Sequence, residues 1–126
     1  VKVIGDISRL DADLQESIRV LEKESEKNTG LRFQIALNYG GRDEIVNAAN
    51  AAIADGHTTL TKEILSKYMY TSASPDPDLI IRTAGEMRLS NFLLWQAAYS
   101  ELYFCDVLWP DFDKKHLDEA LKEFSK

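Results

Sequence analysis

The sequence has one cysteine, two histidines and no long apolar run, so three features that would indicate a particular class of protein are scarce or absent. Its single cysteine, Cys105, cannot form an internal disulfide, which agrees with a reducing compartment, and we expect it to be a small core residue. No apolar stretch approaches the roughly 20 residues that span a bilayer, and the first residues lack the pattern of a signal peptide. We therefore expect a cytoplasmic protein, at most peripheral to the membrane, with no transmembrane segment.

Positive charge is also scarce. The chain has 15 Lys and Arg against 21 Asp and Glu, a formal net charge of −6. Binding to a phosphate backbone depends on clustered Lys and Arg, so this balance argues against nucleic acid as a partner. Neither a Gly-x-Gly-x-x-Gly motif nor a P-loop lysine motif occurs, which leaves a plain nucleotide-binding α/β domain without support. Any anion site must therefore be built from a few cationic side chains close together, against the negative charge of the rest of the chain.

Length and composition allow one folded core. Hydrophobic residues make up 44% of the 126 residues and charged residues 29%, as in ordinary soluble proteins. A chain of this size supports one small core rather than two. There is no repeat and no low-complexity segment, so we do not expect disorder.

Apolar periodicity and turn residues predict strands alternating with helices. We expect strands over 1–5, 31–38, 78–83 and 102–104, and helices over 11–28, 41–55, from 61, 90–98 and 113–124. This order indicates an α/β fold with a mainly parallel sheet flanked by helices on both faces. A parallel sheet of only four strands, the first without a predecessor, predicts a partial fold that lacks amino-terminal strands.

One loop concentrates groups that bind anions. Segment 82–91 reads RTAGEMRLSN and lies between an expected strand end and an expected helix start, where α/β proteins bind ligands. Guanidinium forks match phosphate oxygens, and a helix amino terminus adds free N–H groups. The candidate ligands for a diphosphate are Arg82, Arg88, Ser90 and the Leu89 backbone. The alternative is that the two arginines are ordinary surface residues beside a serine that caps a helix, with no bound ligand.

A carboxylate follows the same segment. Glu101 could hold Mg²⁺ through oxygen and bridge it to substrate phosphates, because Mg²⁺ is bound through one or two carboxylates together with phosphates. A solvated side chain near a strand start is the alternative.

The residues of two segments resemble those of a known protein family. Residues 82–104, RTAGEMRLSNFLLWQAAYSELYF, followed by 106–112, DVLWPDF, closely resemble the carboxy-terminal signature of cis-prenyltransferases, enzymes of the undecaprenyl diphosphate synthase type. Residues 38–46, NYGGRDEIV, resemble a second family segment. The resemblance implies a prenyl-chain elongating transferase that adds isopentenyl diphosphate to an allylic diphosphate, such as farnesyl diphosphate, with cis double bonds. It also implies Mg²⁺ as cofactor and a homodimer in the intact enzyme.

The resemblance carries roles over to single positions. Arg82, Arg88 and Ser90 match the family residues that grip the diphosphate of isopentenyl diphosphate, and Glu101 matches the carboxylate that helps to place Mg²⁺. Met87 departs from the pattern, since many bacterial members have a histidine there and a thioether is a poor Mg²⁺ partner.

Two family features have no counterpart in the sequence. Nothing matches the amino-terminal Asp-Gly-Asn-Gly-Arg loop that holds the allylic diphosphate, nor the basic, glycine-bearing tail of many members. We therefore expect residues 1–126 to be the carboxy-terminal part of a single cis-prenyltransferase domain, which supplies the isopentenyl diphosphate half and is inactive alone. A non-catalytic partner subunit of a heteromeric enzyme is the alternative, although such a subunit would not need the four matched side chains.

Other residues receive structural interpretations. Segment 38–42 is expected to be a turn between a strand and a helix, and a border of the active cleft is the alternative. His57 and His116 are expected to be surface residues without ligand neighbours. The aromatic residues of 92–109 belong either to the core or to a contact between subunits, and the sequence does not divide them.

Overall fold

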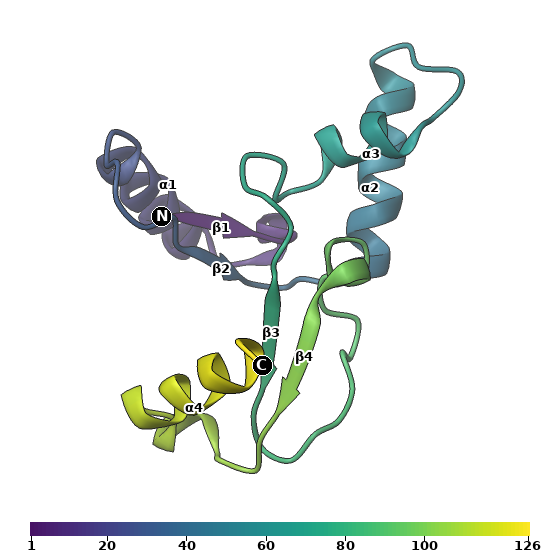
Figure 1. Cartoon of the computed structure of the whole chain (residues 1–126). Helices are drawn as coiled ribbons and strands as arrows, with labels where there is room; N and C mark the ends of the chain where they lie inside the picture. The colour runs from purple at the N-terminus through teal and green to yellow at the C-terminus, as the bar shows by residue number, and fades with distance from the viewer. The chain divides into compact units, whose positions relative to one another are not determined.

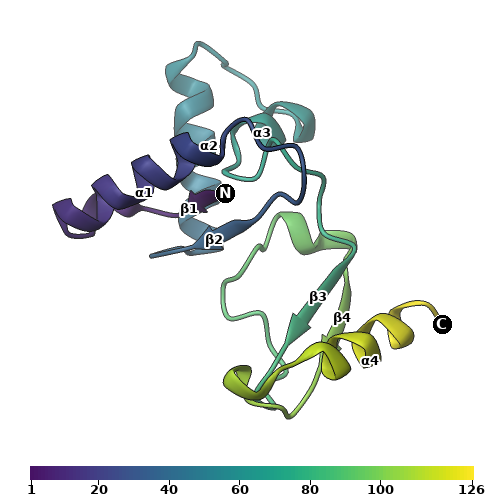
Figure 2. The same cartoon turned by 90° about the vertical axis from the view of Figure 1, so that its left-hand side faces the viewer.

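The computed structural model describes residues 1–126, which form two compact units, Val1–Ala73 and Ser74–Lys126. Each unit contains one two-stranded parallel sheet with its own helices (Figures 1 and 2). The α/β class and the parallel pairing predicted from the sequence are confirmed. None of the helices is both long and apolar enough to cross a membrane.

The first unit begins with the strand β1 and contains most of the helical residues. Its elements are β1 (Lys2–Ile4), the 3₁₀ helix η1 (Ile7–Arg9), α1 (Ala12–Ser25), β2 (Gln34–Ala36), α2 (Gly41–Ala54) and α3 (Lys62–Tyr68). In the sheet, Val3 lies opposite Ile35. Helix α1 contacts β1, and α2 contacts α3. Strand β2 is shorter than expected, and Leu31, at the start of the predicted strand, is 91% exposed.

A glycine allows the chain after β1 to pack closely against the chain after β2. Gly5 has a φ of +114°, and a Cβ atom there would lie 2.0 Å from the carbonyl oxygen of Leu37, so only glycine fits. The Asp6 N–H then donates to the Asn38 carbonyl (3.1 Å), and the Asn38 side-chain amide donates to the Asp6 carbonyl (2.9 Å). These contacts fix the loops that leave the two strands.

Helix α2 buries a carboxylate as well as small apolar side chains. Ala48 and Ala52 are fully buried on its inner face, and Glu44 is 1% exposed. The Glu44 carboxylate accepts hydrogen bonds from the Tyr39 hydroxyl and from the backbone N–H of Tyr70 (2.7 Å). Because a buried carboxylate requires such partners, these bonds are stabilising, and the second one anchors the backbone of Tyr70 to α2.

The second unit contains the other sheet. Its elements are β3 (Leu79–Arg82), the 3₁₀ helix η2 (Gln96–Tyr99), β4 (Glu101–Phe104), the 3₁₀ helix η3 (Trp109–Asp111) and α4 (Lys114–Phe124). Helix α4 contacts β4 and buries Ala120 completely. Asp113 caps α4 as predicted, and His116 completes a capping box, so this histidine has a structural role.

The aromatic residues of 92–109 are divided by the structure. Tyr99 is 98% exposed and Trp109 is 72% exposed, whereas Trp95, Tyr103 and Phe104 are half-buried. Tyr99 and Trp109 are therefore not core residues of this chain. Cys105 is half-buried rather than fully enclosed.

Candidate functional site

The candidate site begins where β3 and β4 end. Arg82 is the last residue of β3, is half-buried, and lies opposite Phe104 in the parallel register. Its carbonyl accepts a hydrogen bond from the Cys105 N–H (3.0 Å), which continues the pairing beyond β4. The predicted location of Arg82, at the carboxyl end of a parallel strand, is confirmed.

A tight turn follows Arg82. Ala84 and Gly85 have φ values of +64° and +71°. The Ala84 N–H donates to the Val107 carbonyl (2.8 Å), and the Gly85 N–H donates to the Cys105 carbonyl (2.9 Å). Both amides of the turn are thus already bonded to protein carbonyls, so an anion at this loop must be held mainly by side chains.

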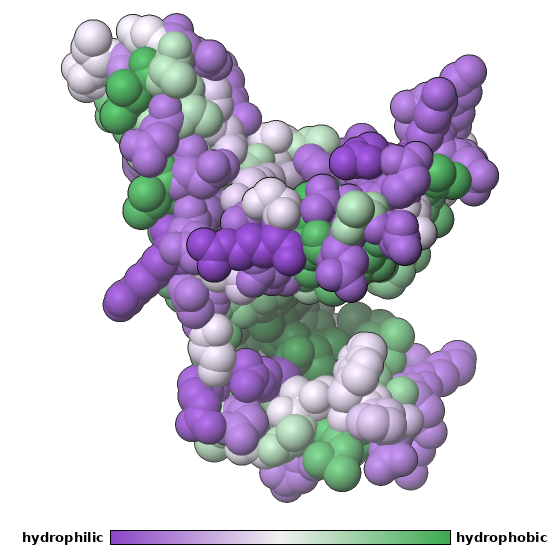
Figure 3. Space-filling view, turned by 180° about the vertical axis from the view of Figure 1, so that it is seen from behind, coloured by the Kyte–Doolittle hydropathy of each residue, from purple (hydrophilic) through white to green (hydrophobic).

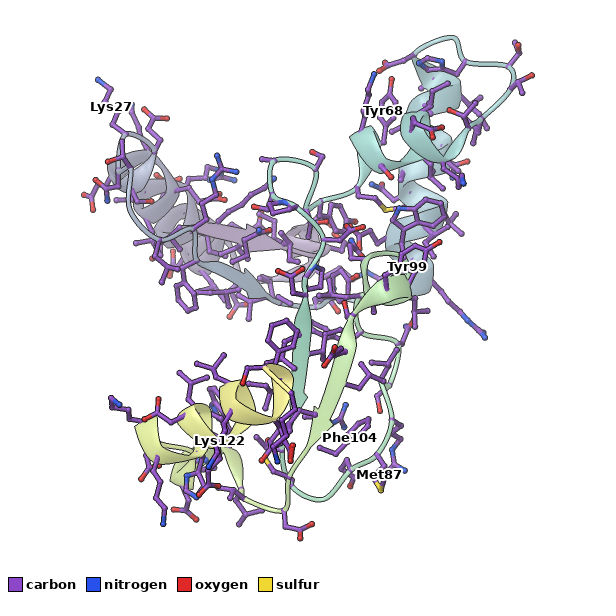
Figure 4. All side chains as sticks on the ribbon, viewed as in Figure 1. Lys27, Tyr68, Met87, Tyr99, Phe104 and Lys122 are labelled. Atoms are coloured by element: carbon purple, nitrogen blue, oxygen red, sulfur yellow. The ribbon has the colours of Figure 1, made fainter.

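Arg88 is the most accessible cation of the loop. Its side chain is 66% exposed and forms an ion pair with Glu86, whose side chain is 40% exposed. Met87, between them in the sequence, is 77% exposed. Figure 4 shows it on the loop near Phe104, the last residue of β4. An anionic ligand can therefore reach the Arg88 guanidinium, and it must replace the Glu86 carboxylate to do so.

The helix predicted over 90–98 is wrong. Ser90, Asn91 and Leu93 have φ values of +49°, +66° and +47°, which lie in the left-handed region and cannot continue a right-handed helix. Only the short 3₁₀ helix Gln96–Tyr99 forms. Consequently no helix amino terminus points at the loop, and Ser90 can contribute only its hydroxyl and local backbone. Leu89 accepts a hydrogen bond from Phe92 N–H (3.0 Å) through its carbonyl.

Glu101 lies at the amino end of the two strands, and Arg82 lies at their carboxyl end. Glu101 is the first residue of β4, is exposed, and pairs with Leu79, the first residue of β3. Three steps of about 3.3 Å along a strand put its backbone roughly 10 Å from the Arg82 end. The second unit therefore brings Arg82 and the arginine loop together, but it does not bring Glu101 to them.

No set of three or more His, Cys, Asp or Glu side chains in the chain is arranged to hold a metal ion. A single carboxylate nevertheless fits Mg²⁺, which usually takes one or two carboxylates and completes its shell with phosphate oxygens and water. Glu101 can supply one such oxygen ligand, and the thioether of Met87 cannot.

The first unit has a polar cavity. Its volume is about 590 Å³, and it opens where β1 and β2 end. Asn38 and Gly40, from the segment for which a cleft border was the alternative, line it, whereas its Gly5–Arg9 wall was not predicted from the sequence. The rule that ligands bind at the carboxyl ends of parallel strands, applied to β1 and β2, could have located it.

Two carboxylates, Asp6 and Asp43, and one guanidinium, Arg9, line the cavity, so its lining is acidic on balance. Hydrogen bonds from the Ser8 side chain and backbone lower the pKa of Asp6, helped by the charge of Arg9. Burial raises the pKa of Tyr70, and the carboxylates of Glu44, Asp6 and Asp43 raise it further. A cavity with this charge does not attract a diphosphate without an added cation.

Solved structures with the same fold identify the class of protein. The lavandulyl diphosphate synthase of Lavandula x intermedia, in complex with dimethylallyl diphosphate, matches with a TM-score of 0.92 at 39% identity over 98% of this chain and 56% of its own. A probable undecaprenyl diphosphate synthase from Campylobacter jejuni matches with a TM-score of 0.91 at 37% identity, over 99% of this chain and 59% of its own. These neighbours are synthases of prenyl diphosphates.

Sequence comparison gives the family. A prenyltransferase family model, described as undecaprenyl diphosphate synthase, matches residues 1–126. The isoprenyl transferase of Fusobacterium nucleatum is 52% identical over 98% of the chain and 54% of its own length, and that of Neisseria meningitidis is 49% identical over 100% and 51%. The chain belongs to the undecaprenyl diphosphate synthase family of prenyltransferases. It spans about half the length of the curated relatives it matches.

Proposed function

We propose that the intact protein elongates prenyl chains by adding isopentenyl diphosphate to an allylic diphosphate, such as farnesyl diphosphate, with cis double bonds. Residues 1–126 are then the carboxy-terminal part of one catalytic domain and supply the isopentenyl diphosphate site. Family membership supports this proposal. The observation that carries it is the placement of Arg82 and Arg88 on one loop at the carboxyl ends of parallel strands, in a chain of net charge −6.

In this proposal Arg82, Arg88, Ser90 and the backbone of Leu89 bind the isopentenyl diphosphate. The half-buried Arg82 is held by its strand, while the exposed Arg88 exchanges Glu86 for a phosphate oxygen. The loop thereby fixes the direction of the isopentenyl double bond, whose electrons attack the allylic carbon as its C–O bond breaks and diphosphate leaves. Loss of a proton from the new cation completes the condensation.

Mg²⁺ is the proposed cofactor, with Glu101 as one of its ligands. When bound, it supplies positive charge to the departing diphosphate. Since Glu101 is at the amino end of the strands and Arg82 at their carboxyl end, its metal must take the remaining ligands from substrate, water or groups outside the arginine loop.

We further propose a cytoplasmic homodimer. Apolar side chains such as Leu108 and Leu117 are exposed on the second unit, where green atoms are visible in Figure 3. The aromatic side chains of Tyr99 and Trp109 are exposed as well. Large aromatic side chains are enriched where protein surfaces meet, which supports a subunit contact there. A non-catalytic partner subunit is the competing function, and the retained Arg82, Arg88, Ser90 and Glu101 speak against it.

The test is an elongation assay with radiolabelled isopentenyl diphosphate, farnesyl diphosphate and Mg²⁺. The intact protein should form polyprenyl diphosphate. The isolated 126-residue chain should form none, because no segment matches the allylic diphosphate loop and bringing the two substrates together supplies much of the rate. Turnover by the isolated chain near that of the intact protein would contradict the proposed division of the site. Activity of the intact protein only after another chain is added would favour the partner-subunit function.

A further inference from the structure

Asp106 lies at the centre of the contacts that hold the arginine loop. Its two sequence neighbours provide the carbonyls that bond the turn, Val107 to Ala84 and Cys105 to Gly85. Its own carboxylate lies against Gly85, where a Cβ atom would be 3.2 Å from Asp106 Oδ1. Three consecutive residues after β4 therefore contact the turn.

This turn depends on such contacts. A positive φ is unfavourable at Ala84, which has a Cβ atom, whereas Gly85 adopts it without steric cost. Backbone of this kind persists only where the surrounding structure fixes it. Arg82 lies just before the turn and Arg88 shortly after it. The turn therefore sets the distance between the two backbone positions from which the guanidinium groups extend.

We propose that Asp106 is a positioning residue for isopentenyl diphosphate. Its side chain, which is exposed to solvent, lies beside Gly85 and keeps the turn in the form that presents Arg82 and Arg88 to one diphosphate. This inference rests on the proposed function. The role is one of shape, because a negative charge beside the loop would oppose an anionic ligand rather than attract it.

The experiment compares four variants of the intact protein: Asp106→Asn, Asp106→Ala, Gly85→Ala and the double variant of the two alanine changes. Calorimetry with inorganic diphosphate measures the affinity of the loop, and steady-state kinetics measure KM and kcat. Asp106→Asn keeps the shape, so KM for isopentenyl diphosphate should stay within about twofold of the parent value. Asp106→Ala should raise that KM about fivefold with little change in KM for farnesyl diphosphate or in kcat, because fewer molecules hold the competent turn.

Gly85→Ala should weaken diphosphate binding about tenfold, since it adds a methyl group against Asp106 at a positive φ. The double variant should bind no more weakly than Gly85→Ala alone, because the carboxylate that meets the new methyl group is gone. Asp111→Ala, which changes an exposed aspartate in η3, is the matched control and should leave every value unchanged. Thermal melts show whether each variant is folded.

Three results would overturn the positioning role: equal losses in Asp106→Asn and Asp106→Ala, no loss in Asp106→Ala, or additive losses in the double variant. Failure of the proposed function is a separate outcome. If the parent binds inorganic diphosphate but does not elongate, the proposed function falls while the affinities still decide the role of Asp106. If the parent does not bind diphosphate, both the proposed function and the positioning role of Asp106 are wrong.

Discussion

Replacement of Arg88 by alanine in the intact protein tests the site most directly, because the structure separates its effect on binding from its effect on stability. The Arg88 and Glu86 side chains are 66% and 40% exposed, and ion pairs with such exposure contribute at most about 1 kcal/mol. We therefore expect the melting temperature to fall by no more than about 2 to 4 °C.

The effect on binding should be much larger. A desolvated, bidentate contact between a guanidinium and a phosphate loses about 2 to 5 kcal/mol when it is truncated. The Glu86 pair, which binding must break, offsets up to about 1 kcal/mol of this. With the full offset we expect a net loss of about 1 to 4 kcal/mol, roughly 5-fold to 1,000-fold in kcat/KM for isopentenyl diphosphate. Arg88→Lys should recover part of the loss, since an ammonium keeps the charge but lacks the planar fork.

The assay is steady-state elongation with isopentenyl diphosphate varied, beside a thermal melt. Arg19→Ala is the matched control: Arg19 forms an exposed pair with Glu16 (2.7 Å, side chains 61% and 65% exposed) on α1, outside the loop. Kinetics of Arg88→Ala within about twofold of the parent would refute the assignment. A collapsed melt would instead make Arg88 a structural residue.

Three further predictions concern carboxylates. Glu101→Gln in the intact protein should weaken the Mg²⁺ dependence of activity with the melt unchanged; a magnesium titration like that of the parent would remove Glu101 from the metal site. Glu44→Ala should destabilise the protein by about 2 to 4 kcal/mol in denaturant unfolding, because two donors lose their buried acceptor, whereas exposed Asp43→Ala should change stability by less than about 0.5 kcal/mol. The backbone hydrogen bond from His116 lowers the pKa of Asp113, so its cap stabilises α4 above the unfolded pKa of about 4 and is lost as pH falls through the lower folded value. Helical circular dichroism should therefore decrease on acidification below about pH 4, and less so in Asp113→Asn; equal pH profiles would contradict the cap.

Local signals predicted some elements closely. Helix α4 was predicted with its cap because Asp113 and the apolar spacing after it act within one or two turns of the chain. The same reasoning failed at Ser90 and Asn91, which look like a helix cap but adopt left-handed backbone. Contacts distant in sequence accompany this region, including the bond from the Ser100 hydroxyl to the Pro77 carbonyl (2.5 Å), and no short pattern encodes them.

The candidate site was predictable in part for similar reasons. The position of Arg82 followed from the strand that precedes it, and the structure confirms it. The separation of Glu101 from Arg82 depends on register, and a strand expected to start at residue 102 hid the fact that Glu101 begins β4 opposite Leu79. Burial of Glu44 was invisible in the sequence, where a carboxylate in the first turn of a helix is normally solvated.

The two-stranded sheets have a practical consequence for work on the isolated chain. Each strand is hydrogen-bonded on one side only, so both sheets have two open edges. Open edges pair readily with other chains, and exposed apolar side chains such as Leu31 and Phe33, next to β2, favour such association. A sample of these 126 residues is thus expected to aggregate at high concentration, and light scattering should accompany any binding or activity measurement made on it.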